Sequence, residues 1–176
     1  TDLVRLGITT AGASYTLTAN VENAEVTSGV ALSLVGNALN NRLTGGGAGD
    51  TLAGDLGSDT LVGGGGGDSL VGGAGNDLYL VDSLSDQVAE SAGGGIDTVQ
   101  LSVATAGGSY TLGSEVENAV LTSAVAFNLT GNGLANSLTG NATANRLDGG
   151  AGADTLTGGG GDDVYVVDNL SDLVVE

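Results

Sequence analysis

A nine-residue period is the feature that most restricts what this chain can fold into. Between residues 36 and 80, a large apolar residue recurs at every ninth position, and an Asn or Asp precedes it by two positions. A fixed short period of this kind is typical of a solenoid, in which each repeat stacks on its neighbours. The apolar positions are Leu43, Leu52, Leu61, Leu70 and Tyr79, and the glycines that open the units are Gly36, Gly45, Gly54, Gly63 and Gly72.

Each nine-residue unit divides into two parts. The first six residues, as in 63–68, are mostly Gly, Ala, Asn and Asp, and glycine allows tight turns because it takes positive φ at little steric cost. The last three, as in Ser69, Leu70 and Val71, predict a very short strand whose middle residue faces a core. Two units should therefore form one coil of about 18 residues, and successive coils should stack about 4.8 Å apart.

The pattern Gly-Gly-x-Gly-x-Asp-x-Leu-x resembles the calcium-binding nonapeptide of the RTX (repeats-in-toxin) family. Residues 54–62 and 72–80 match it closely, and five copies follow one another in frame. The resemblance implies an all-β fold, a parallel β-roll (a right-handed β-solenoid) of nine-residue half-coils, with Ca²⁺ held between successive turns. It also implies a secreted bacterial protein, which is usually exported by a type I system.

Composition favours a cation as partner and disfavours catalysis. The chain has 176 residues, 34 of them Gly, and a formal net charge of −18, so nucleic acids and anionic membrane surfaces should be repelled. It has no His and no Cys, which excludes Ser/His/Asp and Cys/His chemistry. A glycosidase uses one pair of carboxylates, whereas carboxylates here recur at every turn. No apolar run reaches the roughly 20 residues of a membrane helix. We therefore expect a protein that is not an enzyme.

A longer repeat encloses the short one. Residues 14–17 return as 109–112, an offset of 95, whereas Tyr79 returns as Tyr165, an offset of 86, so the two copies differ by one nonapeptide. We expect one continuous roll of about ten coils, part of a longer protein. Its strand-rich coils should keep the period at Ile8, Leu17, Val26 and Leu34 without binding metal. The expected divisions are a first repeat at 1–95 (strand-rich coils 1–35, calcium-binding nonapeptides 36–90) and a second at 96–176 (strand-rich coils 96–130, nonapeptides 131–176).

The sixth position of each unit supplies the candidate metal ligands. Ca²⁺ binds six to eight oxygens, which a Gly-rich turn can offer from backbone carbonyls and from the Asp carboxylate. Units two apart share an edge of the roll, so Ca²⁺ should bridge aspartates 18 residues apart, such as Asp50 with Asp68. The expected ligands are Asp50, Asp59, Asp68, Asp77, Asp86, Asp154, Asp163 and Asp172.

Asparagine holds the same position in three units, at Asn41, Asn136 and Asn145. A neutral amide adds little charge, so these sites should bind calcium weakly or not at all. Their side chains could instead hydrogen-bond to the backbone or stack as an amide ladder. Since two of the three lie in the second repeat, we expect the first repeat to bind more Ca²⁺.

Two functions fit these features. The first is a structural repeat of a large secreted or cell-surface protein, such as an adhesin, surface layer or filament, that folds on binding Ca²⁺ outside the cell. The alternative is an accessory or secretion module of a toxin or enzyme whose active domain lies elsewhere. Apolar residues also stand at outward strand positions. They indicate either local cover by the next unit or self-association into a fibre, lattice or dimer, and they are Leu78, Leu80, Val164 and Val166.

Overall fold

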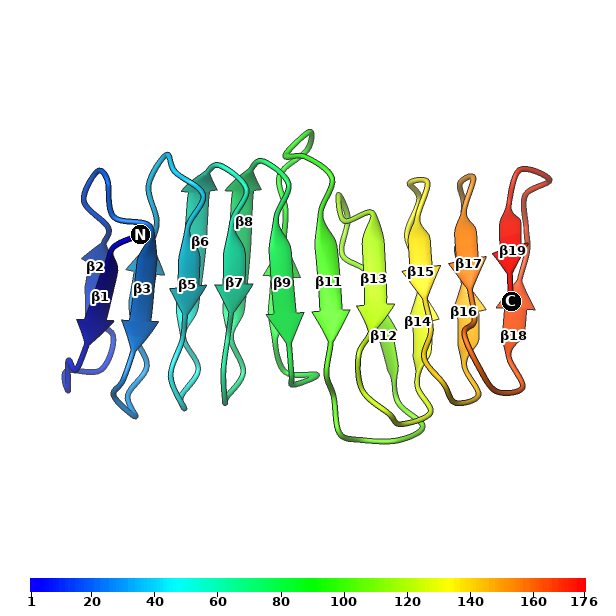
Figure 1. The fold of residues 1–176 in the computed structure, drawn as a ribbon, viewed down its shortest axis with the longest axis horizontal. Coiled ribbons are helices and arrows are strands. Elements are labelled where there is room, and N and C mark those ends of the chain that lie inside the picture. Colours follow the sequence, from blue (N-terminus) through cyan, green and yellow to red (C-terminus); the bar gives the residue numbers. More distant parts are fainter. The chain divides into compact units, whose positions relative to one another are not determined.

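The chain folds entirely into short parallel β-strands. The computed structural model describes all 176 residues as two compact units, Thr1–Asp97 and Thr98–Glu176, and it contains no helix. Within each unit the chain alternates between two sheets, so that consecutive strands never pair and strands two apart do (Figure 1). This arrangement confirms the predicted all-β parallel β-roll.

The first unit consists of two five-stranded stacks. Every pairing within them is parallel. One stack contains, in order, β1 (Leu3–Leu6), β3 (Asn23–Val26), β5 (Arg42–Thr44), β7 (Thr60–Val62) and β9 (Leu78–Val81), and the other contains β2 (Ser14–Thr16), β4 (Ser33–Val35), β6 (Thr51–Leu56), β8 (Ser69–Ala74) and β10 (Gln87–Ala89).

The second unit repeats this plan with one strand fewer. Its pairings are also parallel. One stack contains β11 (Thr98–Leu101), β13 (Asn118–Leu121), β15 (Ser137–Thr139), β17 (Thr155–Thr157) and β19 (Leu173–Val175), and the other contains β12 (Ser109–Thr111), β14 (Asn128–Thr130), β16 (Arg146–Asp148) and β18 (Val164–Val166).

The length of a coil depends on its glycine content. In the glycine-rich part Thr51 pairs with Ser69, 18 residues later, as the period predicts. In the strand-rich part Leu3 pairs with Asn23, 20 residues later, because turns with fewer glycines need more residues to reverse the chain. The expected register is therefore wrong at its start. Ile8 lies beyond the end of β1 and is only half-buried, and Leu6 takes the core position.

The core is one side chain deep from each strand. Leu52 of β6 and Leu61 of β7 are fully buried, and their stacked partners Leu43, Leu70 and Tyr79 are too. Burying one leucine contributes about 1.5–3 kcal/mol, so each coil brings its own share of stability and depends on its neighbours to cover it. The chain forms no helix long and apolar enough to cross a membrane.

Candidate metal centre

The aspartates at the sixth position stack directly on one another. The backbone N–H of Asp50 donates to Oδ1 of Asp68 at 2.7 Å, and that of Asp68 donates to Oδ1 of Asp86 at 3.0 Å. In the second unit, the N–H of Asp154 donates to Oδ1 of Asp172 at 3.0 Å. The predicted stacking of units two apart is thus confirmed, and each carboxylate joins its own coil to the one before.

A second ladder runs along the other edge of the first unit. It begins at Asn41, whose N–H donates to Asp59 at 2.6 Å, and continues from Asp59 to Asp77 at 2.7 Å. The N–H of Asp77 then donates to Oδ1 of Asp97, also at 2.7 Å. Asp97 is fully buried and completes this ladder.

Asp97 is a site residue that the sequence pattern missed. It lies 20 residues after Asp77 rather than 18, because the loop at 92–95 interrupts the period. A signal was nevertheless present, since Asp97 precedes the buried Val99 by two residues, as the other aspartates precede their leucines. With Asp97, the first unit has four pairs that are acidic on both sides, and the second unit has one.

The second oxygen of several of these carboxylates is buried without a hydrogen-bond partner. This holds for Oδ2 of Asp59, Asp68 and Asp77 in the first unit and of Asp154 and Asp163 in the second. All three arginines of the chain are exposed, and two of them pair with surface carboxylates, Arg5 with Glu25 and Arg146 with Asp148. No basic side chain therefore neutralises the buried aspartates.

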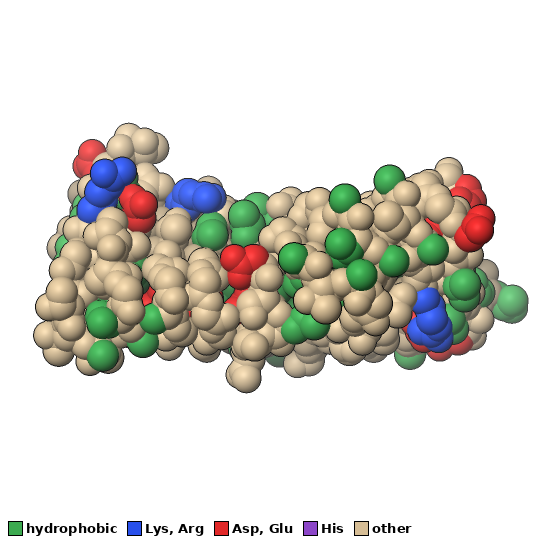
Figure 2. All heavy atoms as spheres, turned by 90° about the horizontal axis from the view of Figure 1, so that it is seen from below, with side chains coloured by type: hydrophobic (Ala, Val, Ile, Leu, Met, Phe, Trp, Pro, Cys, Tyr) green, Lys and Arg blue, Asp and Glu red, His purple; other side chains and the backbone are tan.

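This burial raises the pKa of the carboxyl groups. Desolvation brings the pKa of Asp59 to about 6 and that of Asp68 to about 6, against a backbone hydrogen bond that lowers each, and the neighbouring Asp77 and Asp86 add to the rise. Desolvation raises the pKa of Asp77 and Asp154 as well. Charge of one sign in a dry site is unfavourable unless a cation joins it. Figure 2 shows the counterpart at the surface, where acidic side chains form only small separate groups on the face drawn.

The opening glycines add backbone oxygens to these carboxylates. A Cβ on Gly45 would meet the carbonyl oxygen of Gly63 and Oδ2 of Asp50, and one on Gly54 would meet the carbonyl oxygen of Gly72 and Oδ2 of Asp59. A carboxylate oxygen and a carbonyl oxygen from the next coil thus converge where only glycine leaves room. Hard oxygens of these two kinds are the ligands that Ca²⁺ prefers, so the residues present fit this ion.

The asparagines at the same position do something different. Nδ2 of Asn145 donates to the carbonyl oxygen of Phe127 at 2.7 Å, and Nδ2 of Asn136 donates to the carbonyl oxygens of Val116 and Glu117. The coils beneath them are strand-rich and present acceptors, so an amide donor satisfies what a carboxylate could not. Of the two alternatives for these residues, hydrogen bonding to the backbone is therefore the one observed.

The remaining predicted ligands lie at the ends of the ladders. Asp86 is buried, while Asp163 and Asp172 are half-buried. Backbone N–H groups of Asp154, Asn169 and Asp168 donate to Asp172 and lower its pKa. Its own turn thus satisfies this carboxylate in part. The role of all eight predicted aspartates as metal ligands stays a prediction, whereas their positions along the coil edges are now described.

These features define a class of protein, a parallel β-roll whose turns collect carboxylate and carbonyl oxygens for divalent cations. The sequence model of the RTX calcium-binding nonapeptide repeat matches four overlapping segments, residues 33–61, 44–79, 54–87 and 130–165, which together cover just over half of the chain. The chain belongs to the family of RTX calcium-binding repeats, and such repeats bind calcium. Comparison with curated proteins and with solved structures found no match.

Proposed function

We propose that this chain is a structural repeat of a large secreted or cell-surface bacterial protein, such as an adhesin, a surface layer or a filament, and that it folds on binding Ca²⁺ outside the cell. The observation that carries the proposal is the column of buried carboxylates whose Oδ2 atoms have no hydrogen-bond partner, as at Asp59, Asp68 and Asp77. A protein that folded fully without metal would leave these charges uncompensated.

Calcium binding and folding are coupled in this proposal. Without metal, repulsion between stacked carboxylates and the conformational entropy of 34 glycines oppose the compact state. Binding free energy then becomes folding free energy, as in other metal-dependent domains. Extracellular calcium modules bind with dissociation constants of about 10⁻⁴ to 10⁻³ M. Such a chain stays unfolded at cytosolic calcium and folds after export.

The role assigned here is structural rather than catalytic. Support comes from the absence of His and Cys and from the 95-residue repeat, since stacked near-copies suit an extended spacer. The alternative role, as an accessory module of a secreted toxin or enzyme, predicts a His- and Trp-containing catalytic domain elsewhere in the same gene. Finding such a domain would favour that alternative.

Circular dichroism with and without calcium tests the proposal. We expect the chelated chain to lack most of its sheet signal and to regain it on addition of Ca²⁺, with Mg²⁺ at the same concentration much less effective because it keeps its water ligands. If the chelated chain keeps its full sheet signal and melts at the same temperature as the calcium form, folding is independent of metal and the proposal is wrong.

Self-association is part of the proposal for the second unit. Val164 points outward from β18 and is 55% exposed, whereas Leu78 and Leu80 of β9 are half-buried. An exposed valine on a strand is a favourable site for lateral contact with another roll. Sedimentation velocity in calcium should show a smaller assembly for Val164→Thr than for the unaltered chain, with the double variant Leu78→Thr and Leu80→Thr as comparison. Equal sizes for all three would exclude a contact through these strands.

A further inference from the structure

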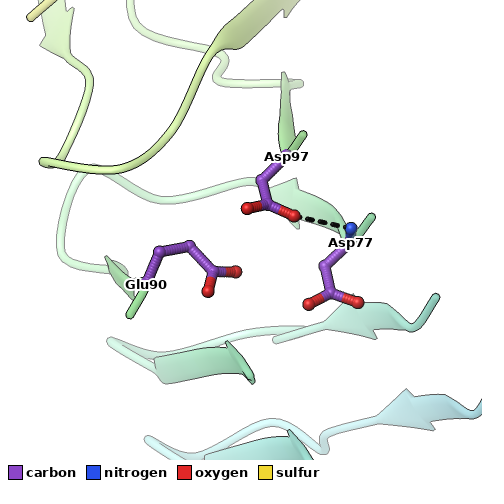
Figure 3. A group of neighbouring side chains, drawn as sticks. All are labelled: Asp77, Glu90 and Asp97. Carbon is purple, nitrogen blue, oxygen red and sulfur yellow. Dashed lines mark hydrogen bonds between the residues drawn. The ribbon is translucent and has the colours of Figure 1, made fainter. Parts of the chain in front are cut away.

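Three carboxylates meet where the glycine-rich coils of the first unit end. Asp77, Glu90 and Asp97 each place one oxygen within 4.8 Å of the others (Figure 3). Asp77 is 2% exposed and Asp97 is fully buried, while Glu90, just after β10, is half-buried. Among the Asp and Glu side chains of the structure, this is the one group of three so placed.

Glu90 takes the place of an opening glycine. It lies 18 residues, or one coil, after Gly72, at the first position of a unit. One coil earlier, the Cα of Gly54 faces the carbonyl oxygen of Gly72 and the carboxylate of Asp59. At Gly72, a carboxylate replaces that carbonyl. A Cβ there would collide with three oxygens, Oδ2 of Asp77, the hydroxyl of Tyr79 and Oε1 of Glu90.

An independent observation indicates a ligand at this point. Oδ1 of Asp77 accepts the N–H of Asp59, but its Oδ2 is buried with no hydrogen-bond partner and lies over Gly72, beside Glu90. The Tyr79 hydroxyl donates to Oε1 of Glu90 and so fixes the carboxylate in this inward position. An anionic oxygen held in a dry, acidic cluster requires a positive partner.

We propose that Asp77, Glu90 and Asp97 form a calcium site with three carboxylates that closes the first unit. The proposal rests on calcium binding by the repeats and adds a ligand that the nonapeptide pattern does not contain. Each turn site has at most two aspartates, whereas this site has three acidic side chains. Because calcium affinity rises with the number of charged ligands, this site fills first as calcium rises and empties last.

The second unit contains a natural control. Tyr165 and Glu176 repeat the spacing of Tyr79 and Glu90, and Glu176 accepts a hydrogen bond from Tyr165. Oδ2 of Asp163 lies over Gly158 together with the Tyr165 hydroxyl, as Asp77 and Tyr79 lie over Gly72. No third carboxylate completes this arrangement. Glu176→Gln therefore removes the same charge from the same kind of tyrosine contact without removing the proposed site.

Calcium titration calorimetry of the full chain tests the proposal. We expect Glu90→Gln to weaken the tightest site at least tenfold, while the remaining sites and the sheet signal at saturating calcium stay as they are. Glu176→Gln should match the unaltered chain. If the Glu90→Gln isotherm superimposes on that of the unaltered chain, or if the variant is destabilised with no change in affinity, Glu90 only holds Tyr79 and the proposal is wrong.

Terbium luminescence gives a second readout that does not depend on the Glu90 variant being folded. Tb³⁺ replaces Ca²⁺ at oxygen sites and emits when a nearby tyrosine is excited, and the chain has no Trp to compete. We expect Tyr79→Phe to remove most of the emission at the first equivalent of Tb³⁺ and Tyr165→Phe to leave it. Unchanged emission from Tyr79→Phe would overturn the site. If calcium left the fold of the unaltered chain unchanged, the proposed function itself would fail as well.

Discussion

The backbone N–H of Asp59 donates to Oδ1 of Asp77 at 2.7 Å, while Oδ2 of Asp77 is buried and has no hydrogen-bond partner. One carboxylate therefore has two separate functions. Its first oxygen connects two coils through the protein alone, and its second is available to a cation. Since the two oxygens differ in this way, a substitution can remove one function and keep the other.

Asp59→Asn should separate the two functions. The amide oxygen can still accept the N–H of Asn41, but an NH₂ group then replaces the oxygen that faces the cation. In calcium we expect the midpoint of folding to shift to about tenfold higher concentration, because a charged ligand is lost. In chelator the sheet signal should equal or exceed that of the unaltered chain, because repulsion with Asp77 is relieved.

Asp55→Asn is the control for this variant. Asp55 is exposed and has φ of 81°, a conformation that Asn tolerates, so its substitution should change neither measurement. A loss of stability for Asp59→Asn that was equal in calcium and in chelator would contradict the assignment of the second oxygen to a cation.

The period of nine predicted the coil, the core and the stacked pairs because each of these depends on local sequence. Asp97 escaped prediction because a loop places it two residues out of frame, and only the folded chain shows that it completes a ladder. Ile8 failed as a core residue because the register of the strand-rich coils is set by longer turns. The polarity of Asn145 depends on the neighbouring coil, which offers the Phe127 carbonyl, and a single nonapeptide contains no record of its neighbour.

Asn145→Asp should destabilise the chain even though it restores the nonapeptide pattern. The new carboxylate oxygen would face the carbonyl of Phe127 with no donor between them, and an unsatisfied buried acceptor costs about 1–3 kcal/mol. Chemical denaturation at saturating calcium measures this loss. Asn76→Asp is the control, because Asn76 is exposed and its oxygen already acts as an acceptor, from the N–H of Ile96. If Asn145→Asp instead bound one more calcium and became more stable, the strand-rich coil could itself serve a cation.

Gly75→Ala should disrupt the stacking of the turns. Gly75 has φ of 134°, and a Cβ there would collide with the carbonyl oxygen of Gly57 one coil away. The backbone strain alone costs about 1–3 kcal/mol, and the clash adds to it. Gly47→Ala is a matched control, since a Cβ on Gly47 meets nothing within 4 Å. We expect thermal melting in calcium to fall clearly for Gly75→Ala and hardly at all for Gly47→Ala. Similar melting of the two variants would show that the turns are not packed as described.

Acidification should favour the metal-free fold. Burial raises the pKa of Asp59 and of Asp68 to about 6, above the ordinary value of 3.8, so the folded chain holds protons more tightly than the unfolded chain. The resulting stability is fully present below about 3.8 and is lost as pH rises through about 6. In chelator, the sheet signal should therefore grow as pH falls from 7 to 5, a range that stays above the isoelectric point near 4.1.

Calcium should reverse this dependence, because protons and Ca²⁺ compete for the same carboxylates. The calcium midpoint is expected to rise as pH falls from 7 to 5. Combining Asp59→Asn with Asp68→Asn removes the two titrating groups and should flatten the pH dependence in chelator. Circular dichroism at each pH, with and without calcium, measures both effects. A chelated chain that lost sheet signal on acidification would show that the buried aspartates of the metal-free fold are already stabilised as anions, which would remove the physical reason for a cation at the coil edges.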